Sequence, residues 1–149
     1  MTRTRDPRIV AAPAPDRTTH RFRGLAVTGL VATVVAMALT TAVAALAAAG
    51  GVDLEVPADG ERIPLAGVTT MTGVFSLLGV VLAAAFLRFS ARPAPRFAWT
   101  AGALTAASLV PPLLSGADAA TASALVGLHL VAAGVMVPAL WWGLRTRTG

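Results

Sequence analysis

The feature that most constrains this chain is an apolar stretch at residues 121–144, TASALVGLHLVAAGVMVPALWWGL. As a helix rising about 1.5 Å per residue, it is long enough to cross the roughly 30 Å hydrocarbon core of a bilayer. Its only ionisable side chain is that of His129, and Trp141 and Trp142 stand just before two arginines. Tryptophan beside arginine is typical of the cytoplasmic membrane interface. The stretch is therefore predicted to be a membrane span.

Composition supports the same class of protein. Hydrophobic residues make up 56% and charged residues 13% of the chain, whereas soluble domains are about 25% charged. The residues that give the net charge of +5 lie outside the apolar runs and do not form the basic face that nucleic-acid binding requires, so no nucleic-acid partner is predicted. The absence of cysteine excludes disulfides and zinc–cysteine sites.

Three further apolar runs precede residues 121–144, and the four runs together predict an all-α, integral membrane four-helix bundle. The membrane domain is expected at residues 24–144, with spans at about 24–49, 67–87, 97–114 and 121–143. Residues 1–23, rich in arginine and proline, are expected to form a disordered tail, and residues 145–149 a short second tail. A cleaved signal peptide is the alternative for the first run, but that run exceeds the usual length of such a segment.

The distribution of arginine predicts the orientation of the bundle. Eleven of the twelve arginines lie in the tail, the second loop or the C-terminal end, and only Arg62 lies in the other two loops. Because cytoplasmic loops carry the excess of basic residues, both termini are predicted to be cytoplasmic. Trp99 and the tryptophans near the C-terminus fall at the same interface. We expect a multi-pass protein of a bacterial plasma membrane whose lipid bilayer is its first partner.

Local breaks are predicted from proline and glycine. Pro111 and Pro112 are expected to terminate or bend the third span, and Pro138 to kink the fourth. The outer loop at residues 50–66 contains three glycines and two prolines, which exclude a helix there. Its residues 52–56 alternate apolar and acidic side chains and predict a short extended segment. The loop offers too few oxygen ligands at fixed spacing for a calcium site, and no metal site is predicted.

His129 is the one polar oddity within the spans. Counted along each helix, it lies in the outer half of the membrane, at a depth shared by five hydroxyls, those of Thr40, Thr41, Thr72, Ser76 and Ser108. Ionisable groups in hydrocarbon usually face the interior of the bundle and find a polar partner. We therefore expect His129 to point inward, within reach of at least one of these hydroxyls.

Three interpretations of His129 follow from this position. It is a neutral, hydrogen-bonded strut between helices, a proton relay or gate in a polar pathway, or a ligand of a metal, haem or other cofactor. The spans contain no carboxylate, cysteine or second histidine, so this chain alone assembles neither a catalytic dyad nor a multi-ligand metal site. No cofactor is predicted.

Several short motifs carry a resemblance to a known family. They are the Gly-Val-Asp-Leu at residues 51–54, Trp99 at the start of the third span, Ser108-Leu109 with Pro111, and His129-Leu130 followed by Pro138. With the four-span layout, they resemble an uncharacterised family of small four-helix membrane proteins from high-GC bacteria, a domain of unknown function. The resemblance covers all but the tail and adds weight to Asp53 and His129. It implies no substrate, reaction or partner.

The predicted function is that of a small integral membrane protein that acts by association, as a homo-oligomer or with a larger membrane partner. The alternative is a permease-like or proton-conducting unit centred on His129. An enzyme is not expected, because the chain shows no nucleophile with a base, no paired carboxylates and no metal cluster.

Overall fold

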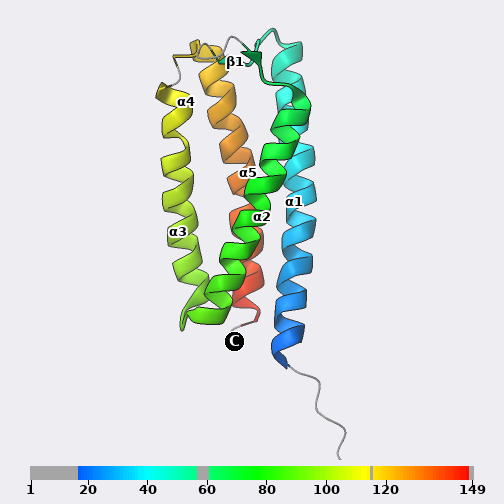
Figure 1. The fold of residues 1–149 in the computed structure, drawn as a ribbon, viewed down its shortest axis with the longest axis vertical. Coiled ribbons are helices and arrows are strands. Elements are labelled where there is room, and N and C mark those ends of the chain that lie inside the picture. Colours follow the sequence, from blue (N-terminus) through cyan, green and yellow to red (C-terminus); the bar gives the residue numbers. More distant parts are fainter. Residues whose placement is uncertain (1–16, 57–60, 115, 148–149) are drawn as a thin grey trace, which may run out of the picture.

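The computed structural model describes residues 17–56, 61–114 and 116–147 and shows an all-helical bundle with a minimal hairpin in one loop (Figure 1). The helices are α1 (Arg17–Ala49), α2 (Leu65–Phe89), α3 (Pro93–Ser108), α4 (Val110–Leu114) and α5 (Ala119–Arg145). Four candidate spans, with α3 and α4 counted as one, are long and apolar enough to cross a membrane. The predicted four-span, all-α architecture is therefore confirmed for the described residues.

The first helix begins earlier than predicted. We expected residues 1–23 to be a disordered tail, yet α1 starts at Arg17, so residues 17–23 are helical. No proline or glycine separates Arg17 from the apolar run, and a helix that is already nucleated extends at little cost. The rest of the predicted tail, residues 1–16, lies outside the described residues.

The helices are arranged so that α1 packs against α2 and α5, and α3 packs against α5 and α2. Figure 1 shows α2 and α3 close together at the arginine-bearing end, where they are joined, and diverging toward the opposite end. We call these the inner and the outer end, after the orientation that the arginines predict. Successive spans run in opposite directions, as short connections require. This arrangement leaves α3 with the least buried surface of the four spans.

The larger core lies toward the arginine-bearing end. It is formed by buried residues of α1, α2, α3 and α5, among them Leu25, Ala83, Phe97 and Leu140. Phe97 is 2% exposed and Leu140 is fully buried. Because lipid is as apolar as these side chains, the core is held by close packing and not by the expulsion of water.

A smaller core lies at the outer end, where Leu54 and Val68 pack with Ala44 and Leu128. The loop above it contains β1 (Glu55–Val56), which pairs antiparallel with β2 (Glu61–Arg62), Glu55 opposite Arg62. The short extended segment predicted at residues 52–56 is thus seen in its last two residues. Leu54 adopts a positive φ of 46° immediately before the hairpin, which turns the chain back over α2.

The predicted effect of the two prolines in the third span is confirmed. α3 ends at Ser108, and the five-residue α4 follows after Leu109. Pro111 and Pro112 cannot donate the backbone hydrogen bonds that would continue α3. α5 runs through Pro138 as one helix, and the kink expected there stays a prediction.

Candidate functional site

The most distinctive polar feature within the spans is a set of hydroxyls between α1 and α2, which we call the threonine layer: Thr40, Thr41, Thr69 and Thr72. The Oγ1 atoms of Thr40 and Thr72 lie 3.1 Å apart, and those of Thr41 and Thr69 lie 2.6 Å apart. Thr40 is 1% exposed and also donates to the carbonyl of Ala36 at 2.8 Å. These two pairs bond adjacent helices in a region where water cannot supply the hydrogen bonds.

Local sequence explains why the layer forms. Thr40 and Thr41 face α2 in the outer half of α1, and Thr69 and Thr72 lie three residues apart on α2, which places them on one face. Gly73 beside them leaves room for Met37, whose Sδ atom lies 3.1 Å from the position a Cβ would occupy. The small residue therefore allows the two helices to approach closely enough for the hydroxyls to meet.

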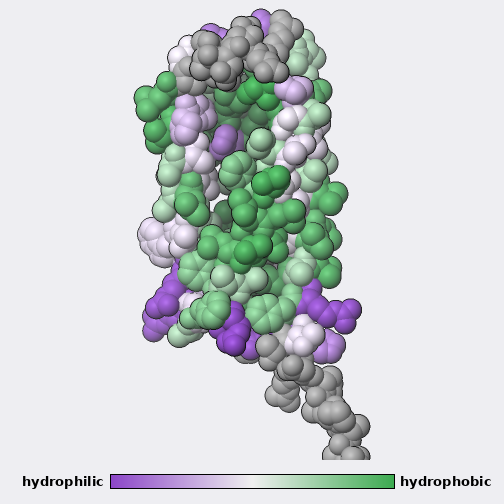
Figure 2. All heavy atoms as spheres, in the orientation of Figure 1, coloured by the Kyte–Doolittle hydropathy of each residue, from purple (hydrophilic) through white to green (hydrophobic). Residues whose placement is uncertain are grey.

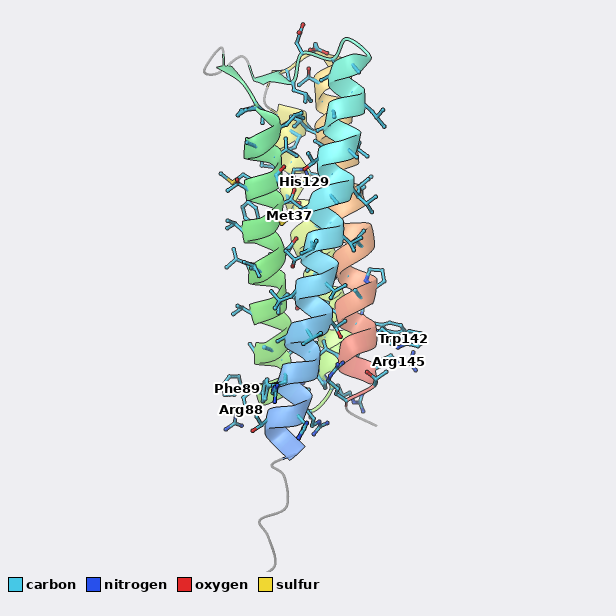
Figure 3. All side chains as sticks on the ribbon, turned by 90° about the vertical axis from the view of Figure 1, so that its right-hand side faces the viewer. Met37, Arg88, Phe89, His129, Trp142 and Arg145 are labelled. Carbon is cyan, nitrogen blue, oxygen red and sulfur yellow. The ribbon has the colours of Figure 1, made fainter. Side chains whose placement is uncertain are left out.

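His129 lies at the depth of this layer. The Oγ1 of Thr33 contacts the Sδ of Met136 at 4.0 Å, which fixes the register of the antiparallel helices α1 and α5. Seven residues, or about two turns, further outward on each helix come Thr40 and His129. The two therefore share one depth, and each lies on the face that makes the Thr33–Met136 contact. Figure 3 likewise shows His129 slightly outward of Met37.

The hydrogen bond expected between His129 and a hydroxyl is nevertheless not formed. Within the described residues, the imidazole of His129 forms its hydrogen bond through Nδ1 to the backbone carbonyl of Leu125, at 2.9 Å. Leu125 lies one turn earlier on the same helix, so this bond forms without ordering a second helix. The side chain is half-buried, which agrees with the expected inward position only in part.

The remaining predicted site residues are not gathered around His129. Ser76 is buried on α2 at 6% exposure, and Ser108 donates to the carbonyl of Thr105 at 2.7 Å at the end of α3. Asp53 is exposed in the loop that follows α1, beyond the spans. The structure therefore brings together Thr40, Thr41 and Thr72 of the predicted set. Across the described segments, no three histidine or acidic side chains cluster in a way that could hold a metal ion.

One polar group that the sequence analysis passed over is Asp118, which caps α5. Its carboxylate accepts hydrogen bonds from the backbone N–H of Ala120 at 2.8 Å and of Thr121 at 3.0 Å, and from the Thr121 hydroxyl at 2.8 Å. These bonds, that from the Thr121 N–H first, lower the pKa of Asp118 below its ordinary value. The signal was available, because an aspartate immediately before an apolar run is a helix-start signature.

The outer half of the bundle is also more open than the inner half. α3 buries only Pro93, Ala94 and Phe97, all in its first turns. Further along, its residues are half-buried or exposed up to Pro112 in α4. Figure 2 shows the surface hollowed between α3 and α2 toward the outer end. The hydroxyls of α3 therefore stand apart from the threonine layer.

A second feature concerns the glycines of the helices. At Gly29 a Cβ would lie 2.5 Å from the Cγ2 of Val80 on α2, and at Gly143 it would lie 3.3 Å from the Cδ1 of Leu25 on α1. At Gly102, Gly127 and Gly134 a Cβ would meet nothing within 4 Å. Gly29 and Gly143 therefore allow close packing inside the bundle. No contact inside the bundle explains why the other three positions are glycine.

Comparison with known proteins matches the chain to a family model. A family described as a family of unknown function, DUF6069, matches residues 20–146. No curated protein and no solved structure matches the chain.

Proposed function

The chain belongs to the DUF6069 family of unknown function, and we propose that it acts by association within a bacterial plasma membrane, first of all with a second copy of itself. The multi-pass membrane character rests on the four apolar helices. In this proposal the protein is a structural or regulatory subunit and not an enzyme, it needs no cofactor, and a larger membrane partner is the variant form of the same idea.

The observation that carries the proposal is the outward face of α5. Gly127 and Gly134 lie seven residues apart and thus on one side of the helix, and neither has a neighbour that its missing side chain accommodates. Ser123 and Pro138, both exposed, lie four residues before and after this pair on the same side. Leu130, three residues after Gly127 and four before Gly134, lies on the same side and is 52% exposed. The face therefore combines small or compact residues with one exposed leucine and is directed away from the bundle.

Glycine in a helix costs about 1 kcal/mol relative to alanine. Inside the bundle, the close contacts of Gly29 and Gly143 account for that cost. On the outside of α5, the same cost is offset if another helix approaches the backbone closely, since small residues permit such contacts in lipid. Copies inserted with the same orientation would place their α5 helices side by side and parallel, related by a two-fold axis along the membrane normal.

Disulfide cross-linking tests this proposal directly, because the chain has no cysteine. Single variants Gly127→Cys and Gly134→Cys are oxidised in native membranes and separated without reductant. The register set by Thr33 and Met136 places Ala42 and Val35 at the same depths on α1, so Ala42→Cys and Val35→Cys are matched controls.

We expect covalent dimers from the α5 variants and monomers from the α1 variants. Equal cross-linking of both helices would indicate random collision, and its absence from both would contradict self-association. Cross-linking of α5 to a different protein that also co-purifies under mild extraction would assign the face to a larger partner.

A further inference from the structure

A cleft lies between the beginning of α1 and the end of α2, at the arginine-bearing end of the bundle. Its volume is about 310 Å³, and it is lined by Arg21 and Phe22 of α1 and by Leu87 and Arg88 of α2. Figure 3 shows Arg88 and Phe89 beside the first turns of α1. Two guanidinium groups and two apolar walls thus meet at the depth where the apolar spans end.

Among the described side chains, the two arginines have no acidic partner. Among the described residues, neither the Arg21 nor the Arg88 side chain forms a hydrogen bond or an ion pair. The Arg88 guanidinium lies over the ring of Phe89, with 5.6 Å from Cζ to the ring centroid. By comparison, Arg96 donates to Ser90, and Arg147 donates to the carbonyl of Gly143 and to Thr28. The cleft therefore carries two positive charges that no described side chain compensates.

The charge of the whole end has the same sign. Arg23, Arg92 and Arg145 also lie at this end, and we call them the girdle. Figure 2 shows hydrophilic patches at this end, below the apolar surface. The acidic residues of the described segments, Asp53, Glu55, Glu61 and Asp118, all lie in the loops at the opposite end. An anion entering the cleft is therefore attracted by its lining and by the surrounding girdle together.

We propose that this cleft binds the headgroup of an anionic phospholipid. A guanidinium matches phosphate oxygens in a bidentate manner, and basic pockets between helices at the membrane surface bind such headgroups. Phe22 and Leu87 provide the apolar contact that the glycerol and the first acyl carbons require. The volume equals that of roughly ten water molecules, which accommodates one phosphodiester with its glycerol.

The position of the cleft selects a lipid over a soluble anion. Leu87 lies on the apolar run of α2 and packs against the inner core, whereas Arg88, the next residue, is exposed. A ligand that contacts both Leu87 and Arg88 therefore needs an apolar part directly beside a charged part. A phospholipid does so, and a free phosphate ion does not.

Native mass spectrometry of the full chain released from detergent micelles tests this site. The probes are phosphatidylglycerol, which is anionic, phosphatidylcholine, which has the same phosphate but no net charge, and inorganic phosphate. The variant R21Q/R88Q removes both guanidinium groups of the cleft. The matched control R23Q/R92Q removes the same charge from the same end without changing the lining.

We expect the wild-type chain to retain phosphatidylglycerol in preference to phosphatidylcholine. At about 1 kcal/mol per basic residue, R21Q/R88Q is expected to weaken that binding roughly 30-fold, and the control less than about threefold. Equal losses in the two variants would show diffuse attraction by the girdle and overturn the site. Displacement of the lipid by inorganic phosphate would reassign the cleft to a soluble anion.

The single variants R88Q and R92Q repeat the comparison with the smallest change to the protein. Helical content by circular dichroism checks that each variant is folded before its lipid affinity is measured. Here we expect a loss of about fivefold for R88Q and a loss of less than about twofold for R92Q, which lies outside the lining. The same affinity for both single variants would contradict the proposal.

Discussion

Toward the arginine-bearing end, buried side chains come from all four long helices, whereas toward the outer end they come from α1, α2, α5 and the loop, with α3 set apart. The inner half interlocks bulky residues such as Phe97 and Leu140. The outer half joins α1 to α2 through paired hydroxyls and leaves His129 bonded to its own helix.

The inner and outer halves thus hold their helices together by different means. Close packing in the inner half depends on shape and on glycines that allow contact. Hydrogen bonding in the outer half depends on a few hydroxyl groups, which meet because Gly73 allows α1 and α2 to approach closely. We therefore expect substitutions in the inner half to reduce stability more than comparable substitutions in the outer half.

The largest effect is expected from Leu140→Ala. Leu140 is fully buried and surrounded by the larger core, so the cavity left behind collapses poorly and costs about 3 kcal/mol of unfolding free energy. Leu128→Ala, on the same helix but in the smaller outer core, is expected to cost about half as much. Denaturant titration in mixed micelles measures the unfolding free energy of both variants. An equal or greater loss for Leu128→Ala would contradict the greater dependence of the inner half on close packing.

The next effect concerns two glycines. Gly29→Ala would place a Cβ 2.5 Å from the Cγ2 of Val80, a β-branched side chain with little rotamer freedom, and is expected to cost about 2 kcal/mol. Gly102→Ala meets nothing within 4 Å and is expected to be neutral or to gain up to about 1 kcal/mol from helix propensity. Thermal unfolding in detergent compares them. Stabilisation by Gly29→Ala would show that the α1–α2 contact is looser than described.

A smaller effect is expected from the threonine layer. Thr40→Val, Thr72→Val and the double variant form a cycle whose coupling energy reports the 3.1 Å contact. Interhelical hydrogen bonds in membranes contribute about 0.6 kcal/mol on average, and we expect a coupling of that size. Strict additivity of the two single variants would mean that the hydroxyl pair does not hold α1 to α2.

The smallest effect is a pH dependence that arises from the exposed cap of α5. The hydrogen bonds to Asp118 lower its pKa below the ordinary 3.8. Its stabilisation is therefore complete above the unfolded value and is lost as the pH falls through the folded one. Asp118→Asn removes this titration, so the stability advantage of the wild-type chain over the variant should shrink on acidification. A constant difference between the two melting temperatures would contradict the described cap.

The spans could be predicted because apolar length is a local property of the sequence, and residues 121–144 needed no tertiary information. The start of α1 could not be placed, because composition does not show how far a long helix continues into a polar segment. The bend near Pro111 could be predicted from backbone chemistry alone. The cap at Asp118 was equally readable from local sequence.

The partners within the site were less predictable. Depth along each helix placed Thr40, Thr72 and His129 at one level, but side-chain direction depends on how the helices rotate against each other. A histidine in a helix can also reach the carbonyl one turn before it, and this local bond was formed in place of the one expected across helices. The cleft at Arg21 and Arg88 joins segments distant in sequence and required the packed structure.

The central claim is self-association through the outward face of α5 that bears Gly127 and Gly134. Energy transfer between copies in lipid vesicles tests it. Donor- and acceptor-labelled chains carry their dye on a cysteine appended to the C-terminal end, and the protein is diluted stepwise with lipid. Self-association predicts energy transfer that persists on dilution. The transfer should be lost when Gly127 and Gly134 are both replaced by leucine, and it should be retained when Gly102 is replaced. Transfer that falls with dilution as expected for freely mixing monomers, in the unaltered chain, would contradict it.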